Sequence, residues 1–282
     1  MSKTIIISSQ NYVANSNNTF TYNLPNECVF ESTSKVGLQA VYMYNSTFNI
    51  SSKIGNNTFQ IIWNANTTTT YNVTIPDGYY SGSDLNYFIQ SQFVANNLYM
   101  TTNSGTNFEY FTEILVNSIR YAFQINTYPL PTASQATTIG FSMPSQATWT
   151  LPTVSCSPQI VLCLGLGVLL GFNKTLTYPT LSTFGSNQTY LSDSTPIISP
   201  VNSYLLTLNL INSNLSIPTN IFYSIPLNVS FGSLISIGNS DIIYNQISPG
   251  RYRHFTVQFI DQNYNTLYLN DTEVVIVLSI IE

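Results

Sequence analysis

Residues 69–94, TTYNVTIPDGYYSGSDLNYFIQSQFV, contain the clearest local structural signals in the chain. The segment begins as a strand, because Tyr71, Val73 and Ile75 alternate with polar residues and therefore share one face. The sequence PDG at residues 76–78 predicts a turn that ends this strand. The first half of the segment is thus typical of a half-buried β-strand.

The second half of the same segment predicts a helix. Ser83 is expected to cap it, with Asp84 in the first turn, where the helix dipole favours a carboxylate. Apolar residues follow at helical spacing and form one stripe, made of Leu85, Phe88, Ile89 and Phe93. No other part of the chain reads as clearly helical, so we expect one short helix packed against β-structure.

The rest of the chain is dominated by short runs in which apolar and polar residues alternate. Pro226 lies within one run and predicts an edge strand or a bend, whereas residues 274–281 are apolar on both faces and predict a central, fully buried strand. Strands with long connections and no regular alternation with helices predict an all-β, antiparallel sandwich. The runs that we interpret as strands cover residues 20–24, 36–44, 59–63, 119–125, 204–210, 221–231, 255–259 and 274–281.

The composition is unusual for its lack of charge. A chain of 282 residues fits one large β domain or two smaller domains, and 44% hydrophobic residues are enough to fill a core. Charged residues make up only 7%, far below the roughly 25% of ordinary soluble domains. Either other subunits cover much of the surface, because the centres of protein interfaces are depleted in charge, or the richness in Asn reflects an AT-rich genome.

The charge and cysteine content argue against several classes of partner. The net charge is −5 and only seven residues are Lys or Arg, so nucleic-acid binding is not expected. Cys28, Cys156 and Cys163 are odd in number and have no CxxC spacing, which is typical of free thiols in a reducing compartment. The first residues lack the long apolar segment of a signal peptide, which agrees with assembly in the cytoplasm.

Two segments leave alternatives open. Residues 159–172, QIVLCLGLGVLLGF, are shorter than the roughly 20 apolar residues of a bilayer span, so we expect a buried segment rather than membrane contact, and no transmembrane segment. At the N-terminus, a short apolar strand at residues 3–9 precedes a polar stretch at residues 11–18. Residues 1–18 are therefore interpreted as an arm, or equally as a frayed terminus.

The sequence contains no recognisable catalytic, cofactor-binding or metal-binding constellation. His254 is the only histidine, no GxSxG motif accompanies it, and its expected role is that of a strand residue. Asp241, Asp261 and Asp271 lie in separate turns and are expected to form those turns. Arg251, Arg253 and His254 are the only basic cluster, which is either a solvated face or a contact with an acidic neighbour.

Four segments, taken in order, resemble the penton (minor capsid) proteins of virophages, Polinton-like viruses and related members of the adenovirus lineage. No single segment is specific, and together they cover the chain from about Val36 to its end. They are KVGLQAVYMYNSTFNI at residues 35–50, TYNVTIPDGYYSGSDLNYFIQSQF at residues 70–93, LLGF at residues 169–172, and RYRHFTVQFIDQNYNTLYLNDTEVVIVLSII at residues 251–281.

The resemblance implies a jelly-roll core, homopentamers at the vertices of an icosahedral virion, the major capsid protein as a partner, and no enzyme activity or cofactor. Under it, residues 19–282 form a single jelly-roll capsid domain with an elaborated region at residues 51–200. Residues 3–7 of the arm would add a strand to a neighbouring capsid subunit. The main alternative is a receptor- or carbohydrate-binding sandwich, such as a viral fibre head, in which Trp63 and Trp149 stack on sugars. An enzyme is a more distant alternative.

Overall fold

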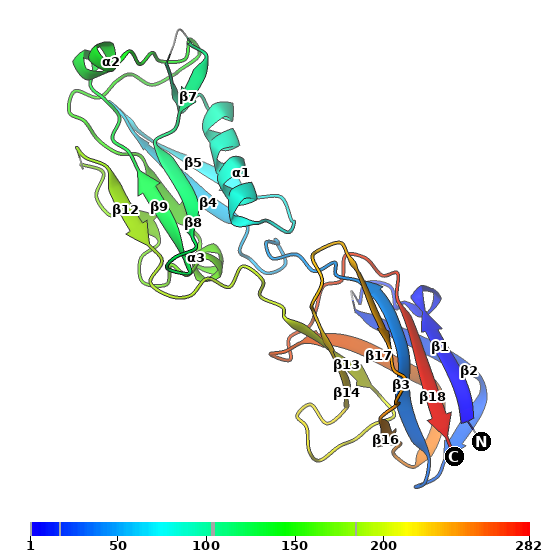
Figure 1. Cartoon of the computed structure of the whole chain (residues 1–282). Coiled ribbons are helices and arrows are strands. Elements are labelled where there is room, and N and C mark those ends of the chain that lie inside the picture. The colour runs from blue at the N-terminus through cyan, green and yellow to red at the C-terminus, as the bar shows by residue number, and fades with distance from the viewer. Residues whose placement is uncertain (1, 17, 103–104, 184) are drawn as a thin grey trace. The chain divides into compact units, whose positions relative to one another are not determined.

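The computed structural model describes residues 2–16, 18–102, 105–183 and 185–282. The chain forms two compact units (Figure 1). Unit 1 comprises Met1–Phe48 and Val201–Glu282, and unit 2 comprises Asn49–Pro200. Unit 2 is therefore inserted in the sequence of unit 1. Its bounds are close to residues 51–200, which the sequence predicts as an elaborated region within a single domain.

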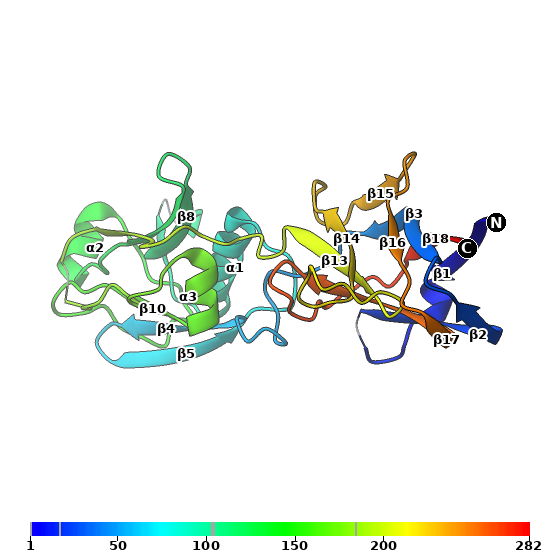
Figure 2. The same cartoon turned by 90° about the horizontal axis from the view of Figure 1, so that it is seen from below.

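Unit 1 consists of two antiparallel sheets, which Figure 2 shows as two layers. One sheet has the strand order β1-β18-β3-β15, with β16 also paired to β3, and the other has the order β14-β13-β17-β2. The strands are β1 (Ser2–Ser8), β2 (Thr19–Phe30), β3 (Lys35–Tyr44), β13 (Ser203–Leu208), β14 (Ile221–Pro226), β15 (Leu234–Gly238), β16 (Tyr244–Gln246), β17 (Gly250–Asp261) and β18 (Val275–Ile281).

The strand order of unit 1 is that of a jelly roll. β15 and β16 pair with opposite halves of β3, so we count them together as the sixth strand of unit 1. When the strands of unit 1 are numbered from one to eight in chain order, the two sheets have the orders 1-8-3-6 and 5-4-7-2. Antiparallel pairs join the first strand to the eighth, the second to the seventh, the third to the sixth and the fourth to the fifth. This nesting is a long hairpin rolled into two facing sheets, which confirms the expected all-β jelly-roll sandwich.

The N-terminal segment is a strand of this jelly roll and not an arm. β1 pairs with β18 along its whole length, from Ser2 opposite Ile281 to Ser8 opposite Val275. Ile7 is completely buried in the core. The expectation that this segment is an arm apart from the body is therefore wrong, because the C-terminal strand of the same chain satisfies the backbone groups on one edge of β1. Pairing of residues 3–7 with a neighbouring subunit, through the other edge of β1, stays a prediction. A short 3-10 turn at Ser9–Asn11 then leads towards β2.

Other strand predictions for unit 1 are confirmed with two exceptions. The run at residues 221–231 is a strand only as far as Pro226, and residues 227–231 lie in the connection to β15. β14 ends at Pro226 and is an edge strand, as expected for a residue that lacks a backbone N–H. β18 is central, with β1 and β3 on its two sides. Only its core face is fully buried, through Ile276, Leu278 and Ile280; on the opposite face Ser279 is buried, but Val275 is 37% exposed. The expected burial on both faces is therefore wrong.

Unit 2 combines small antiparallel sheets with three helices. The sheet orders are β11-β10-β4-β5, β12-β9-β8 and β6-β7. Figure 2 shows α1 and α3 on the same side of β4 and β5. The elements are β4 (Thr58–Asn64), β5 (Thr68–Thr74), α1 (Gly82–Ala95), β6 (Met100–Thr102), β7 (Asn107–Glu109), β8 (Thr112–Asn117), β9 (Ala122–Thr127), α2 (Ala133–Ile139), β10 (Gln159–Leu162), α3 (Leu164–Leu170), β11 (Thr177–Tyr178) and β12 (Gln188–Leu191).

The predicted helix is α1, but Ser81 caps it rather than Ser83. The Asp84 backbone N–H donates to the Ser81 hydroxyl (3.2 Å), and the Ser81 N–H donates to the Asp84 carboxylate (2.9 Å). This reciprocal capping box satisfies two backbone donors and starts the helix earlier than expected. The expected apolar stripe faces the core of unit 2, with Leu85, Ile89 and Phe93 buried.

The expectation of a single helix is wrong, because α2 and α3 are also helical. α2 begins with a capping box between Thr132 and Gln135. α3 divides the apolar run at residues 159–172 into a strand and a helix, with Cys163 as its N-cap and Gly171 as its left-handed C-cap. Most of this run is buried, as expected, but Leu164 and Val168 are exposed. Among the described residues, no helix is long and apolar enough to span a bilayer.

One predicted strand in unit 2 begins later than expected. Of the alternating residues 119–125, residues 119–121 lie in the turn between β8 and β9 and residues 122–125 lie in β9, so Ile119 is 96% exposed at the tip and Tyr121 has a left-handed backbone (φ 49°). The Arg120 backbone N–H donates to the side-chain oxygen of Asn117 (3.1 Å), which closes the turn. Apolar residues happen to alternate through the turn as they do in β9, so the sequence pattern alone does not reveal where the turn ends.

Candidate functional site

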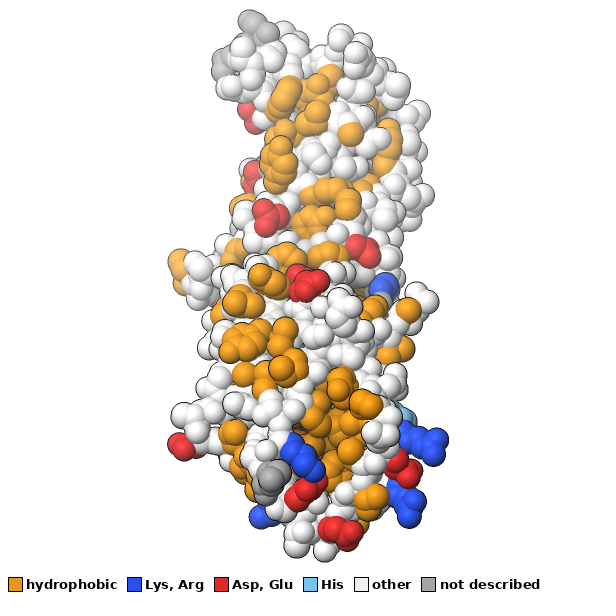
Figure 3. Space-filling model, turned by 90° about the vertical axis from the view of Figure 1, so that its right-hand side faces the viewer, with side chains coloured by type: hydrophobic (Ala, Val, Ile, Leu, Met, Phe, Trp, Pro, Cys, Tyr) orange, Lys and Arg blue, Asp and Glu red, His pale blue; other side chains and the backbone are white. Residues whose placement is uncertain are grey.

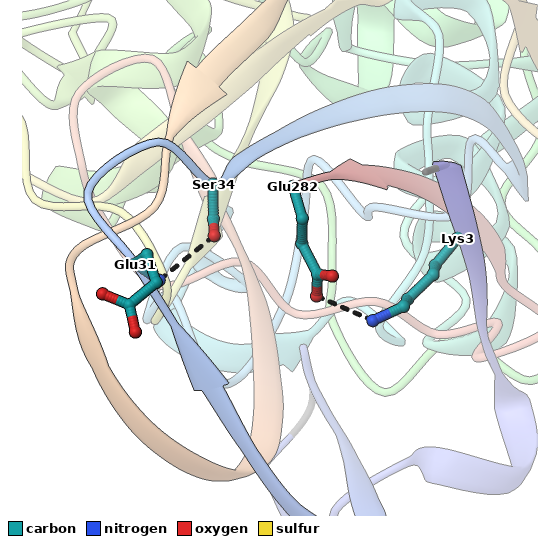
Figure 4. Close-up of polar contacts among 4 residues, drawn as sticks. All are labelled: Lys3, Glu31, Ser34 and Glu282. Carbon is teal, nitrogen blue, oxygen red and sulfur yellow. Dashed lines mark hydrogen bonds and ion pairs between the residues drawn. The ribbon is translucent and has the colours of Figure 1, made fainter.

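Charged residues of unit 1 gather at the end of the sandwich where the chain begins and finishes, which we call the terminal end. By strand register, Lys3 lies opposite Ile280, Lys35 opposite Ile281, and the start of β17 opposite the end of β2. The β2–β3 turn closes this end, with the Glu31 N–H donating to the Ser34 hydroxyl (3.2 Å; Figure 4). Four of the seven basic residues of the chain lie here: Lys3, Lys35, Arg251 and Arg253.

Two arginines on β17 share one carboxylate on β2. Arg251 and Arg253 lie 3.5 Å and 3.7 Å from Glu27, and their side chains are 74% and 81% exposed. The pairing of β17 with β2 is irregular between Tyr252 and His254, which brings Glu27 between the two guanidinium groups. The expected acidic neighbour is thus in the same chain, on a solvated face. One carboxylate balances only one of the two cations, so this site retains positive charge.

A second ion pair joins the two ends of the chain. The Lys3 ammonium donates to the Glu282 carboxylate at 2.7 Å (Figure 4), and this hydrogen bond raises the pKa of Lys3. Both side chains are about half exposed, at 55% and 42%. Exposed pairs of this kind contribute little to the free energy of unfolding, so this pair is a feature of the surface and not an important source of stability.

The edges of β1 and β2 form an apolar flank of unit 1, which we call the open side. Ile5, Leu24 and Cys28 are only partly buried there, although they pack on the core, and Ile6 and Val29 are 56% and 54% exposed. Figure 3 shows hydrophobic side chains gathered on this face of unit 1, with charged side chains on both sides of them. An apolar centre with a charged border is the usual anatomy of a protein interface.

The opposite flank, formed by β14, β15, β16, the loops that join them and the loop between β13 and β14, is almost free of charge; we call it the loop side. Residues 201–250 contain a single charged residue, Asp241. Several aliphatic side chains on this flank are exposed, among them Leu215 (98%), Ile217 (82%), Ile243 (75%) and Leu234 (49%). The run without charge was visible in the sequence, but only the strand order places it on one flank.

The remaining residues singled out from the sequence are apart from one another. His254 is exposed on β17, Cys28 belongs to unit 1, and Cys156 and Cys163 belong to unit 2; all three thiols are free. Burial raises the pKa of the Cys156 thiol, which disfavours the reactive thiolate. The described residues contain no group of three side chains that could hold a metal ion.

Two of the three acids form turns, as predicted. The Asp261 carboxylate accepts hydrogen bonds from the N–H groups of Asn263 and Asn265, both at 2.8 Å. The Asp271 carboxylate accepts one from the Glu273 N–H (2.8 Å). Asp241 is exposed on the loop side between β15 and β16.

Both tryptophans fill the core of unit 2. Trp63 is fully buried and Trp149 is 5% exposed, and their rings meet edge to face with centroids 5.0 Å apart. The Trp149 indole N–H donates to the Asn97 carbonyl (2.7 Å). Neither ring offers a face to a sugar, so the stacking role considered for a carbohydrate-binding protein is wrong.

A groove of about 440 Å³ lies over β4, β5 and β10 of unit 2. Its lining offers amide and hydroxyl groups, and Gln60 and Asn72 already bond to each other within it (2.8 Å). Phe59, its one aromatic residue, is 2% exposed and so gives no stacking surface. The groove therefore lacks the aromatic platform considered for sugar binding.

The comparisons with known proteins give likeness in structure only. No family model matches the chain, and no curated protein matches it. Over nearly its whole length the chain is similar to the mavirus penton protein. The identity is 11% and the TM-score 0.42, over 99% of this chain and 97% of that one. A chain from the structure of the Sputnik virophage is similar at 11% identity and a TM-score of 0.38, over 99% and 96% of the two chains.

The four segments that carry the sequence resemblance have structural roles in both units. The first is β3 and the start of unit 2, and the last contains β17 and β18. In the IPDG segment, the Asp77 carboxylate accepts from the Ser52 N–H (2.7 Å) and from the hydroxyl groups of Ser51 and Ser52, which lowers its pKa. These segments therefore build the fold, and none of them contributes to a pocket with catalytic groups.

Proposed function

We propose that this chain is a structural capsid protein that forms the pentameric vertex of an icosahedral virion. It would assemble in the cytoplasm of the host cell, act beside the major capsid protein, and need no cofactor and no catalytic residue. Nucleic acid would not be its partner, because the chain is acidic and its few basic residues are partly paired with acids.

The observation that carries this proposal is the pair of exposed apolar flanks on an eight-stranded jelly roll. Jelly rolls occur in capsid proteins, lectins and cupins, so the strand order alone does not separate these functions. The flanks support a protein that assembles, since both expose aliphatic side chains to a degree that a monomer in solution does not require. The order of the four resembling segments supports the vertex protein in particular.

The burial of both tryptophans speaks against the carbohydrate-binding alternative, but a fibre head that binds a protein receptor needs no exposed tryptophan. The two functions differ in symmetry, because fibre heads are commonly trimers. The mass of the assembled particle therefore separates them.

The test is light scattering of the purified chain at low and at high salt, alone and with the major capsid protein. Five copies of a 31.4 kDa chain give about 157 kDa. We expect this mass with little dependence on salt, since few ion pairs would hold the ring together. A chain that stays monomeric at micromolar concentration and forms no ring with the major capsid protein contradicts the proposal. A trimer contradicts it as well and favours the fibre head.

A further inference from the structure

The loop side of unit 1 has the properties of an interface core. Among its exposed side chains, Ile243 and Leu215 are aliphatic, and Asp241 is its only charge. Desolvating aliphatic groups is favourable, whereas desolvating a charge is costly, so a flank of this composition is suited to burial. A large exposed apolar area on a soluble protein normally marks a contact surface.

The open side is complementary to the loop side in charge and similar to it in apolar character. Ile6 and Val29 are exposed on it. At its border, Glu27 is the one carboxylate that pairs with Arg251 and Arg253 among the described residues, which leaves positive charge uncompensated. The single carboxylate of the loop side, Asp241, supplies the opposite charge.

We propose that the occupant of each flank is a second copy of this chain, with the loop side of one unit 1 against the open side of the next. The two flanks are opposite each other in the strand order, with β1 and β2 at one side and β15 and β14 at the other. One heterologous contact, repeated around a ring, therefore covers both flanks of every copy. A partner of a different kind would have to cover the two flanks separately. This inference rests on the proposed function, since it names the surfaces through which the ring closes.

The experiment compares the assembly of single variants by sedimentation velocity over a range of concentrations. Ile6→Asp and Ile243→Asp each place a carboxylate at an exposed apolar position of one flank, and each should weaken assembly by about tenfold or more. The matched control is Tyr264→Asp, because Tyr264 is also exposed (53%) but lies in the turn after β17, away from both flanks. Circular dichroism and thermal melting verify that each variant is folded.

Charge reversal tests the pairing of the flanks. Asp241→Arg and Arg253→Glu should each weaken assembly by about threefold, and the double variant should recover part of the loss. A wild-type chain that assembles while Ile6→Asp and Ile243→Asp assemble equally well overturns this inference and leaves the proposed function intact. The same holds if those variants assemble normally but no longer bind the major capsid protein. A wild-type chain that never assembles overturns both.

Discussion

Replacing Ile7 and Ile6 by alanine, one at a time, tests whether the N-terminal segment is a strand of the jelly roll. The two isoleucines are neighbours on β1 and differ only in the face they occupy: Ile7 is 0% exposed and Ile6 is 56% exposed. Ile→Ala removes three carbon groups, each worth about 0.8 kcal/mol when buried, so the transfer term for Ile7 is about 2.4 kcal/mol. A residual cavity adds to this cost, and buried Ile→Ala changes typically cost about 2–5 kcal/mol.

Because β1 is an edge strand, its surroundings can relax, and we expect about 3 kcal/mol for Ile7→Ala. For Ile6→Ala we expect about 0.5 kcal/mol or less, as for other surface positions. The assay is urea unfolding followed by circular dichroism, at a concentration where both variants have the same oligomeric state. The midpoint should fall clearly for Ile7→Ala alone. Equal and small effects of the two substitutions would show that the segment is a loose arm, and would refute the assignment of β1 to the sheet.

Three further predictions concern unit 2. Gly171→Ala should destabilise the protein by about 2 kcal/mol or more, since Gly171 has a left-handed backbone (φ +84°) and a Cβ there would meet the Ser194 carbonyl oxygen; a melting temperature equal to that of the wild type would contradict this. Ser81→Ala should cost about 1 kcal/mol through loss of the α1 capping box, whereas Ser83→Ala should cost much less; equal losses in urea unfolding would restore Ser83 as the cap. Burial, with a smaller contribution from Asp193, raises the pKa of Tyr178 to about 12, so in the unfolded chain this phenol ionises first, near its ordinary pKa of 10. Its contribution to stability is therefore complete below pH 10 and is lost as the pH rises towards about 12, and Tyr178→Phe should flatten that part of the stability–pH curve.

Local physical chemistry made a large part of the fold predictable from the sequence. Tyr71, Val73 and Ile75 alternate because one face of β5 and its continuation meets the core, and the apolar stripe of α1 follows from the helical period in the same way. Pro226 predicts an edge strand because it cannot donate to a ladder on both sides. The turn roles of Asp261 and Asp271 follow from the ability of a short carboxylate to accept hydrogen bonds from backbone groups two or more residues later.

The candidate site was only half visible in the sequence. The scarcity of charge and the long uncharged run at residues 201–250 could be read directly. Which strands carry these residues to one flank could not, because periodicity reports which face of a strand is buried and says nothing of which strand lies beside it. The contact of Arg251 and Arg253 with Glu27 depends in the same way on an irregular pairing of β17 with β2.

The sequence by itself thus determined the all-β class, the helix α1 and the poverty of charge that points to assembly, because each of these depends on residue type or on neighbours a few positions apart. Only the tertiary structure decided that β1 belongs to the jelly roll, that residues 118–121 turn before β9 begins, and that Asn49–Pro200 forms a unit of its own. The physical reason is that strand pairing is non-local. Ser2 pairs with Ile281 at the other end of the chain, and a pattern of neighbouring residues cannot predict a contact between residues so far apart in the sequence.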